Sequence, residues 1–315
     1  MMTRTECARW LLRHDNFCIL THLRPDGDTV GSSAALCLGL RQLGKTAHVL
    51  ENPEITEKYK PLHQGLTKAA AEECDTLISV DIASAGLLPQ NAKPLLDRIA
   101  LRIDHHFSAT SFTLEELVDH TAGACGEIIY DVLTEMGVKL DKIIAIPLYT
   151  AVSTDTGCFR YPNTTAHTLR TAAACHDTGA DLHLVNQLLF DTNSLPKLRI
   201  QGWIAENTRF LSDGKFAVCA IPLSVEQELG VTEDDMDNIS GFPRSIEGVC
   251  MAATLRQTAD GGIKVSVRAV PGYDASAVCA KFGGGGHKGA AGVSMRMPLG
   301  EAAAIIENAM LELYQ

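Results

Sequence analysis

The chain has 315 residues, of which 46% are hydrophobic and 21% are charged, a balance that excludes a disordered chain and suits two ordinary domains. A net charge of −11 argues against broad non-specific binding to duplex DNA, although a cationic pocket in an acidic protein can still hold a small anion. No apolar run reaches the ~18 residues of a membrane span, and charged residues begin at Arg4, so neither a membrane segment nor a signal peptide is expected.

The ten cysteines are scattered, never form a C-x-x-C pair, and in several cases, such as Cys18 and Cys219, lie inside apolar runs. Free buried thiols are the usual occupants of such positions. A disulfide scaffold and a thiolate zinc site are therefore disfavoured, and the cysteine pattern is typical of the reducing cytoplasm.

Apolar runs alternate with helical patterns through the first part of the chain. Buried strands are predicted at residues 16–21, 47–51, 76–81 and 98–104. Helices are predicted at residues 29–44, 123–137 and 141–152. Gly44 and Gly137 are good residues for ending the first two helices, whereas Pro147 lies inside the third. Such alternation predicts a parallel sheet with both faces covered, in an α/β domain of residues 1–190.

The pattern changes after about residue 190. A linker is predicted at residues 191–212, followed by a smaller α/β domain of residues 213–315 in which the strands are grouped. The strands are predicted at residues 215–223, 248–257 and 263–270, and the helices at 274–282 and 300–315. With two α/β domains in one chain, we expect an active site in the cleft between them.

Acidic and histidine side chains follow several of the predicted apolar elements of the first domain. His22, Asp26 and Asp28 follow the first predicted strand, and Asp81 ends a second. His105 and His106 follow a third strand, and Asp155 lies just beyond a helix. The carboxyl ends of parallel strands line one crevice, so side chains distant in sequence become neighbours there. The candidate metal ligands are His22, Asp26, Asp28, Asp81, His105 and Asp155.

Each cluster alone has an ordinary structural explanation, such as Asp28 capping the helix that follows it. Their recurrence at the ends of four apolar elements argues for a metal centre instead. Four aspartates in one crevice would repel each other and raise each other's pKa unless cations neutralised them, and two divalent ions balance four carboxylates. Mixed carboxylate and imidazole ligands suit manganese, and also iron, cobalt or zinc, better than an all-oxygen magnesium site would, and Mn²⁺ is the metal we expect.

Four sequence motifs give this pattern a family resemblance. The stretches HLRPDGDTVGS, VDIAS, DHH and STDTGCF, in that order, resemble the four motifs of the DHH phosphoesterase family. The stretch KFGGGGHKGAAG, at residues 281–292, resembles the signature of the DHH-associated C-terminal domain. The resemblance covers nearly the whole chain, and the combination of motifs is far more specific than any one of them.

The resemblance assigns roles to the candidate residues. It implies that one metal ion is held by His22, Asp26 and Asp81, and the other by Asp28, Asp81, His105 and Asp155. Asp81 would then bridge the two ions. His106 would lie beside the substrate phosphate rather than serve as a ligand, so that Asp81 and His106 are the catalytic candidates.

The glycine-rich stretch offers candidate substrate-binding groups. Successive glycines let backbone N–H groups approach an anion closely, although a glycine run is more often a flexible turn. Arg268, on the polar face of its predicted strand, could bind a phosphate through two hydrogen bonds or could be a solvated strand arginine. The candidate substrate-binding residues are Arg268, Gly284, Gly285, Gly286, His287 and Lys288.

The resemblance implies a two-metal phosphoesterase. The chain lacks the length of the long-strand exonucleases of the family, and its glycine–histidine stretch differs from the pyrophosphatase branch. The chain most resembles the branch whose members are oligoribonucleases, or nanoRNases. The resemblance therefore implies degradation of short single-stranded oligonucleotides and linear dinucleotides to mononucleotides, and conversion of 3′-phosphoadenosine 5′-phosphate (pAp) to AMP.

Two alternatives stay open: a phosphodiesterase dedicated to linear or cyclic dinucleotides from second-messenger turnover, and a nucleotide-binding sensor without catalysis. Neither duplex DNA nor a membrane is expected as a partner. A homodimer is compatible with the sequence, which leaves the oligomeric state, the metal loaded and the cleavage polarity open.

Overall fold

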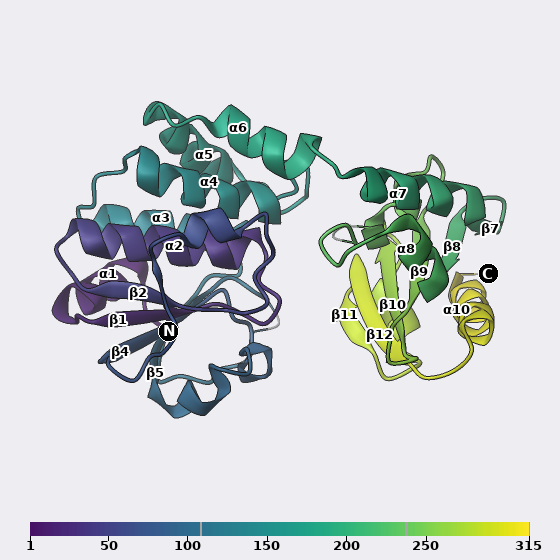
Figure 1. Cartoon of the computed structure of the whole chain (residues 1–315), viewed down its shortest axis with the longest axis horizontal. Coiled ribbons are helices and arrows are strands. Elements are labelled where there is room, and N and C mark those ends of the chain that lie inside the picture. Colours follow the sequence, from purple (N-terminus) through teal and green to yellow (C-terminus); the bar gives the residue numbers. More distant parts are fainter. Residues whose placement is uncertain (108, 237–238, 315) are drawn as a thin grey trace. The chain divides into compact units, whose positions relative to one another are not determined.

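The computed structural model of the chain describes residues 1–107, 109–236 and 239–314. The chain divides into two compact units, Met1–Thr192 and Asn193–Gln315, and each is considered by itself (Figure 1). Among the described residues, none of the helices combines the length and the apolar character that crossing a bilayer requires.

The N-terminal unit is built on a six-stranded sheet with the order β3-β2-β1-β4-β5-β6, in which every neighbouring pair is parallel. The strands are β1 Phe17–Leu20, β2 Ala47–Leu50, β3 Thr67–Lys68, β4 Thr76–Val80, β5 Ile99–Asp104 and β6 Glu115–Val118. The predicted parallel α/β architecture is therefore confirmed, and all four predicted strands are present.

Side chains alternate along the strands and fill a core on each face of this sheet. Phe17 and Ile19 belong to the core beneath the long helices, whereas Cys18 and Leu20 belong to a second core on the opposite face. Figure 1 shows α2, α3 and α4 together on one side of the sheet. The α-helices of this unit are α1 Arg4–Arg13, α2 Gly27–Gln42, α3 Cys125–Glu135, α4 Lys142–Asp155, α5 Ala166–Asp177 and α6 Leu182–Asn186.

Two glycines bring α2 and α4 unusually close together. A Cβ atom on Gly27 would collide with the side chain of Thr154, and one on Gly31 would collide with the carbonyl oxygen of Pro147. These contacts show that the helices run antiparallel, with the amino end of α2 beside the carboxyl end of α4. The prediction of a helix through Pro147 is confirmed, and the helix continues to Asp155.

The prediction missed several elements of this unit. Helix α1 begins at a capping box formed by Thr3 and Glu6, and strand β6 carries two glutamates and lies at an edge of the sheet. Strand β6 lacks the apolar run on which the strand prediction depends, because an edge strand has a neighbouring strand on one side only.

The C-terminal unit contains a mixed sheet with the order β11-β12-β10-β9-β8-β7, in which only β8 and β9 are parallel neighbours. Its strands are β7 Arg209–Leu211, β8 Phe216–Ile221, β9 Met251–Gln257, β10 Ile263–Ala269, β11 Gly285–His287 and β12 Ala290–Met295. Its α-helices are α7 Leu195–Asn207, α8 Leu223–Leu229, α9 Ala275–Ala280 and α10 Leu299–Tyr314.

Two features of this unit differ from the sequence-based picture. The segment 191–212, expected as a linker, forms α7 and β7 and belongs to the second unit from Asn193 onward. The glycine-rich stretch forms the short edge strand β11 rather than an open loop. The alternation predicted for β10 is present, since Val265 and Val267 are buried while Lys264 is exposed.

The contact between α2 and α4 generates a stability prediction. We expect Gly31→Ala to lower the free energy of unfolding by about 1–3 kcal/mol, because the new methyl group must push the two helices apart. Gly202→Ala is the control, since a Cβ at this helical position meets no atom within 4 Å. Urea unfolding followed by circular dichroism measures both; a Gly31→Ala protein as stable as wild type would contradict the tight-contact interpretation.

Candidate metal centre

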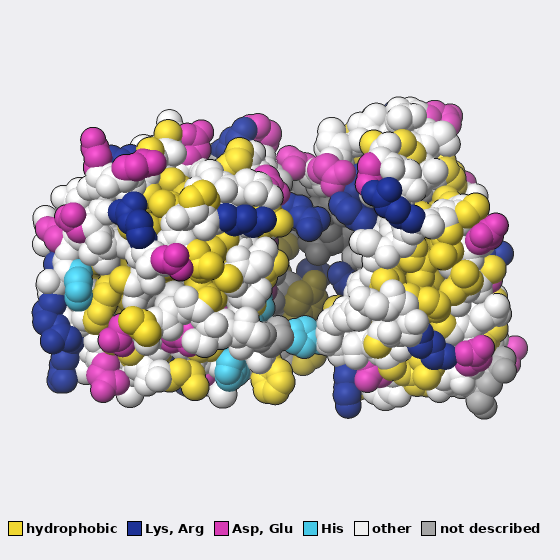
Figure 2. All heavy atoms as spheres, turned by 90° about the horizontal axis from the view of Figure 1, so that it is seen from below, with side chains coloured by type: hydrophobic (Ala, Val, Ile, Leu, Met, Phe, Trp, Pro, Cys, Tyr) yellow, Lys and Arg dark blue, Asp and Glu magenta, His cyan; other side chains and the backbone are white. Residues whose placement is uncertain are grey.

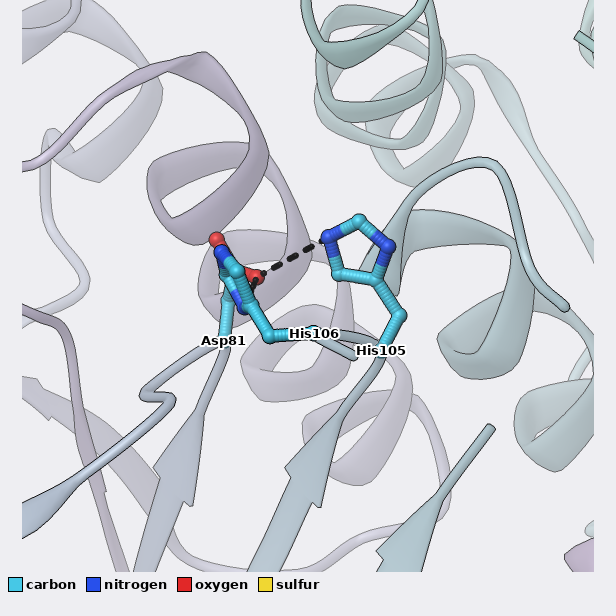
Figure 3. Close-up of side chains that lie close together, drawn as sticks. All are labelled: Asp81, His105 and His106. Atoms are coloured by element: carbon cyan, nitrogen blue, oxygen red, sulfur yellow. Dashed lines mark ion pairs between the residues drawn. The ribbon is translucent and has the colours of Figure 1, made fainter. Parts of the chain in front are cut away.

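The candidate ligands gather at the carboxyl edge of the parallel sheet. Asp81 follows β4 directly, and His105 and His106 follow the neighbouring strand β5. Figure 3 shows that the side chains from these two strands turn toward a common space. The adjacency of β1, β4 and β5 is therefore what brings residues from distant parts of the sequence together.

One cluster consists of His22, Asp26 and Asp81. The Nε2 atom of His22 lies 3.4 Å from Oδ1 of Asp26 and 3.8 Å from Oδ2 of Asp81. The other ring nitrogen, Nδ1, lies 2.9 Å from the carbonyl oxygen of Leu23. The carbonyl accepts a hydrogen bond from Nδ1–H, so Nε2 is the ring nitrogen that faces the two carboxylates and is available to a cation.

A second cluster consists of Asp28, His105 and Asp155. The Nε2 atom of His105 lies 3.6 Å from Oδ2 of Asp28, 3.5 Å from Oδ2 of Asp155 and 3.5 Å from Oδ1 of Asp81. Its Nδ1 atom lies 3.2 Å from the carbonyl oxygen of Ala122, which orients the ring as Leu23 orients His22. Asp81 thus faces both clusters, one with each carboxylate oxygen.

Helix amino ends hold two of the carboxylates. Oδ1 of Asp26 accepts the backbone N–H groups of Asp28 and Thr29, so Asp26, not Asp28, caps α2. Asp28 is instead buried and accepts hydrogen bonds from the backbone N–H groups of Cys125 and Gly126. Those groups begin α3, whose own N-cap residue is an alanine without a capping side chain. Asp28 therefore satisfies the amino end of a different helix from its own.

Asp81 occupies a constrained position. Its backbone is left-handed, with a φ of 61°, and its N–H donates to the carbonyl oxygen of Ile103 at 2.8 Å. Aspartate tolerates this conformation better than most residues with a side chain. Its Oδ1 atom is buried and has no hydrogen-bond partner among the described residues. A buried carboxylate oxygen without a donor is costly unless a cation binds it.

The carboxylates of the site destabilise each other's ionised forms. Burial, followed by repulsion from Asp28, raises the pKa of Asp81 well above the ordinary aspartate value. The same two causes raise the pKa of Asp155 to about 7. Burial also raises the pKa of Asp28. Bound cations would remove this penalty, because they neutralise the carboxylates that now repel each other.

The arrangement fits divalent metal ions. Both histidines direct Nε2 at carboxylate oxygens across 3.4–3.8 Å, which is too long for a good hydrogen bond. Two ligands that each lie about 2.1 Å from one ion are separated by roughly 3.0–3.5 Å, so slightly expanded ligand shells match these separations. Together with the unpaired oxygen of Asp81, this geometry favours metal ligation over ordinary ion pairing.

His106 has a different environment from His105. Its Nδ1 atom lies 2.8 Å from Oδ1 of Asp104, and the same oxygen accepts the backbone N–H groups of both histidines. His106 could join Asp81 and His105 in a third possible ligand group. Asp104 occupies its Nδ1 atom and leaves Nε2 available, and its side chain is 36% exposed against 12% for His105, which favours a substrate-facing position.

Two supporting residues were not among the sequence-predicted site residues. Asp104 is fully buried; burial opposes its ionisation, but the hydrogen bond and charge of His106 outweigh this and lower its pKa. Its place at the end of a buried strand is the signal that could have identified it. The side-chain amide of Asn163 donates hydrogen bonds to the carbonyl oxygens of Gly123 and Asp155, and so connects the loop after α4 to the segment before α3. It lies in a polar loop and has no comparable signal.

The substrate-binding candidates lie in the C-terminal unit. Gly284 and Gly286 allow close approach of the chain to β12, since a Cβ on either would collide with that strand. The glycines are therefore explained first by strand pairing, which the anion-binding interpretation did not anticipate. Residues Gly285–Lys288 remain exposed. Ala290 on β12 pairs with both Arg268 on β10 and His287 on β11, so these two side chains share one face of the sheet.

Comparison with known proteins agrees with this picture. A model of the N-terminal domain of the DHH family matches residues 16–152, and a model of the DHHA1 domain matches residues 213–311. The chain is 31% identical to a Thermus thermophilus protein named bifunctional oligoribonuclease and PAP phosphatase NrnA, in an alignment that covers 88% of this chain and 83% of that protein.

Solved structures share the fold. An exopolyphosphatase-related protein from Bacteroides fragilis has a TM-score of 0.90 at 23% identity, with 98% of this chain and 95% of that chain covered. RecJ from Thermus thermophilus in complex with Mn²⁺ has a TM-score of 0.56 at 14% identity, with 98% of this chain and 55% of that chain covered.

The two clusters generate a prediction about metal binding. We expect Asp81→Ala to weaken Mn²⁺ binding by more than the roughly 10–100-fold that loss of a supporting residue costs, because Asp81 faces both clusters. His105→Ala should lose about half of the bound metal, whereas His106→Ala should retain it. Calorimetric titration with Mn²⁺ and elemental analysis measure this. Equal metal loss in both histidine variants would show that His106 is also a ligand.

Proposed function

This chain belongs to the DHH family, and from that premise we propose that it is a two-metal phosphoesterase that hydrolyses short oligonucleotides to mononucleotides and pAp to AMP. The observation that carries the proposal is the pair of histidine–aspartate clusters that share Asp81. The name of the Thermus thermophilus relative, an oligoribonuclease and PAP phosphatase, supports the same substrate class.

We infer that the site holds two divalent ions, with Mn²⁺ as the preferred metal. His22, Asp26 and Asp81 would hold one ion, and Asp28, Asp81, His105 and Asp155 the other. Such ions supply Lewis-acid stabilisation of charge on the phosphoryl group and lower the pKa of the attacking water. The mixed nitrogen and oxygen ligands support Mn²⁺. RecJ from Thermus thermophilus, which shares the fold, has been solved in complex with Mn²⁺.

His106 is proposed to serve the leaving group. With Nδ1 fixed by Asp104, its Nε2 atom can hydrogen-bond to the leaving oxygen and give it a proton. The buried carboxylate of Asp104 also stabilises the protonated form of the ring, since hydrogen bonding and charge from Asp104 outweigh burial and raise the pKa of His106. His106 would therefore be protonated near neutral pH more often than an isolated histidine.

The C-terminal unit is proposed to bind the part of the substrate that does not react. Arg268 and His287 share one face of the sheet, His287 ends the edge strand β11, and Lys288 follows it directly. An arginine, a histidine and a lysine together suit a phosphate or a terminal nucleotide. Binding energy gained there supports turnover by positioning the scissile phosphate.

We propose that the enzyme acts in the cytoplasm on single-stranded substrates. All ten cysteines lie in the described part of the chain and are free thiols, which supports this prediction. The net charge of −11 supports short substrates over duplex DNA, because duplex binding depends on many phosphate contacts.

A substrate panel tests the proposed function. In Mn²⁺, we expect turnover of pAp, pApA and pGpG, with kcat/KM falling as single-stranded RNA grows longer and with no hydrolysis of pyrophosphate. The reactions use the full-length protein, and their products are separated and measured by chromatography. Turnover confined to one dinucleotide would favour a dedicated phosphodiesterase. Tight binding without turnover would favour a sensor, and efficient digestion of long RNA would contradict the proposal.

A second prediction concerns the non-reacting end of the substrate. We expect Arg268→Ala to reduce kcat/KM for pAp by the equivalent of roughly 2–4 kcal/mol, the scale for losing a charge-assisted pair. Hydrolysis of bis-p-nitrophenyl phosphate, which has no second phosphate, should fall much less. Lys264→Ala, an exposed cation four residues away on the same strand, is the control. Equal losses on both substrates would place Arg268 in the chemical step or in folding.

A further inference from the structure

An exposed aromatic ring stands next to the metal centre without a structural reason for its exposure. Phe107 follows His106 directly, and 80% of its surface is exposed. The other large exposed aromatic side chains among the described residues are Tyr161 and Phe210, at 50% and 49%. Burying a phenylalanine side chain is worth roughly 1.5–3 kcal/mol, so the fold forgoes a substantial stabilisation at this position.

A second ring restrains Phe107. The rings of Phe107 and His120 meet at an angle of 66° with their centroids 5.7 Å apart, an edge-to-face contact. His120 follows β6, and Phe107 follows β5, which pairs with β6 through Asp104 and Val118. Both rings therefore leave the same edge of the sheet that carries the metal ligands. On the face drawn in Figure 2, histidine side chains lie beside exposed apolar side chains on the N-terminal unit.

We propose that Phe107, supported by His120, is the stacking surface for the base of the nucleotide whose phosphate enters the metal centre. This inference rests on the proposed function and adds a specificity determinant to it. Bases stack on aromatic side chains whatever their hydrogen-bonding pattern, so such a surface selects nucleotides without selecting one base. Consecutive Cα atoms lie about 3.8 Å apart, so the ring begins within one nucleotide's length of His106.

Tyr161 is the competing aromatic side chain, because it lies six residues after Asp155. Its ring packs so closely on Gly157 that a Cβ atom there would collide with it. Part of the Tyr161 ring is thus already covered by its own loop, whereas the described contact of Phe107 is the edge-to-face one with His120. The structure favours Phe107, and Tyr161 becomes the matched control.

The kinetic test compares pApA with an abasic sugar–phosphate dimer of the same length. We expect Phe107→Ala to lower kcat/KM for pApA about 10-fold and to leave the abasic substrate and the metal content unchanged. Phe107→Trp should retain activity on pApA. Tyr161→Ala and Leu114→Ala, which removes another fully exposed apolar side chain, should behave like wild type on both substrates.

A binding measurement keeps the inference testable apart from catalysis. The indole introduced by Phe107→Trp should lose fluorescence when AMP binds to the Mn²⁺-loaded protein and should not respond to ribose 5-phosphate. The wild-type chain, with Trp10 and Trp203, gives the background signal.

The outcomes separate this inference from the proposed function. Wild-type turnover of pApA with no selective loss in Phe107→Ala, or a selective loss in Tyr161→Ala, would overturn the stacking surface alone. An equal loss on both substrates would also overturn it. If the wild-type protein hydrolyses neither substrate, the proposed function is refuted. If the fluorescence of the Phe107→Trp variant also does not change on addition of AMP, the stacking surface is refuted as well.

Discussion

Mutual repulsion among buried carboxylates is the constraint around which the N-terminal unit is organised. The carboxylates of Asp28, Asp81 and Asp155 all lie within 3.6 Å of the Nε2 atom of His105. Such an arrangement opposes folding unless positive charge is brought to the same place. The amino ends of α2 and α3 provide part of it, since each donates backbone N–H groups to one aspartate. Metal ions would provide the rest.

The supporting contacts distinguish the three histidines of the site. His22 and His105 each place Nδ1 on a backbone carbonyl, which leaves Nε2 as the ring atom that faces the carboxylates. His106 places Nδ1 on the carboxylate of Asp104, which favours the protonated ring. His105 and His106 are adjacent in the chain, yet their Nδ1 atoms have different hydrogen-bond partners, a carbonyl oxygen and a carboxylate.

The two units contribute different properties to the proposed enzyme. With metal bound, the histidine–aspartate clusters of the N-terminal unit would supply chemistry that any phosphoester could use. Selectivity has to come from groups that contact the remainder of the substrate, and the candidates are Arg268 and His287 on one sheet face and Phe107 beside the metal centre. Charged groups recognise a phosphate, whereas an aromatic ring recognises a base. A short nucleotide offers both, which a simple phosphate ester does not.

The sequence by itself determined the parallel sheet, the strands that carry the ligands and the identity of the six candidate ligands. It could do so because apolar strands are local patterns, and because the carboxyl ends of parallel strands meet wherever such a sheet forms. The tertiary structure decided which carboxylate caps α2, how Asp104 orients His106, and that Gly284 and Gly286 serve strand pairing. Asp28 reaches the amino end of α3, 97 positions away, because α2 and α3 pack against each other. Contacts of this kind depend on how the elements pack together, and no local pattern in the chain encodes them.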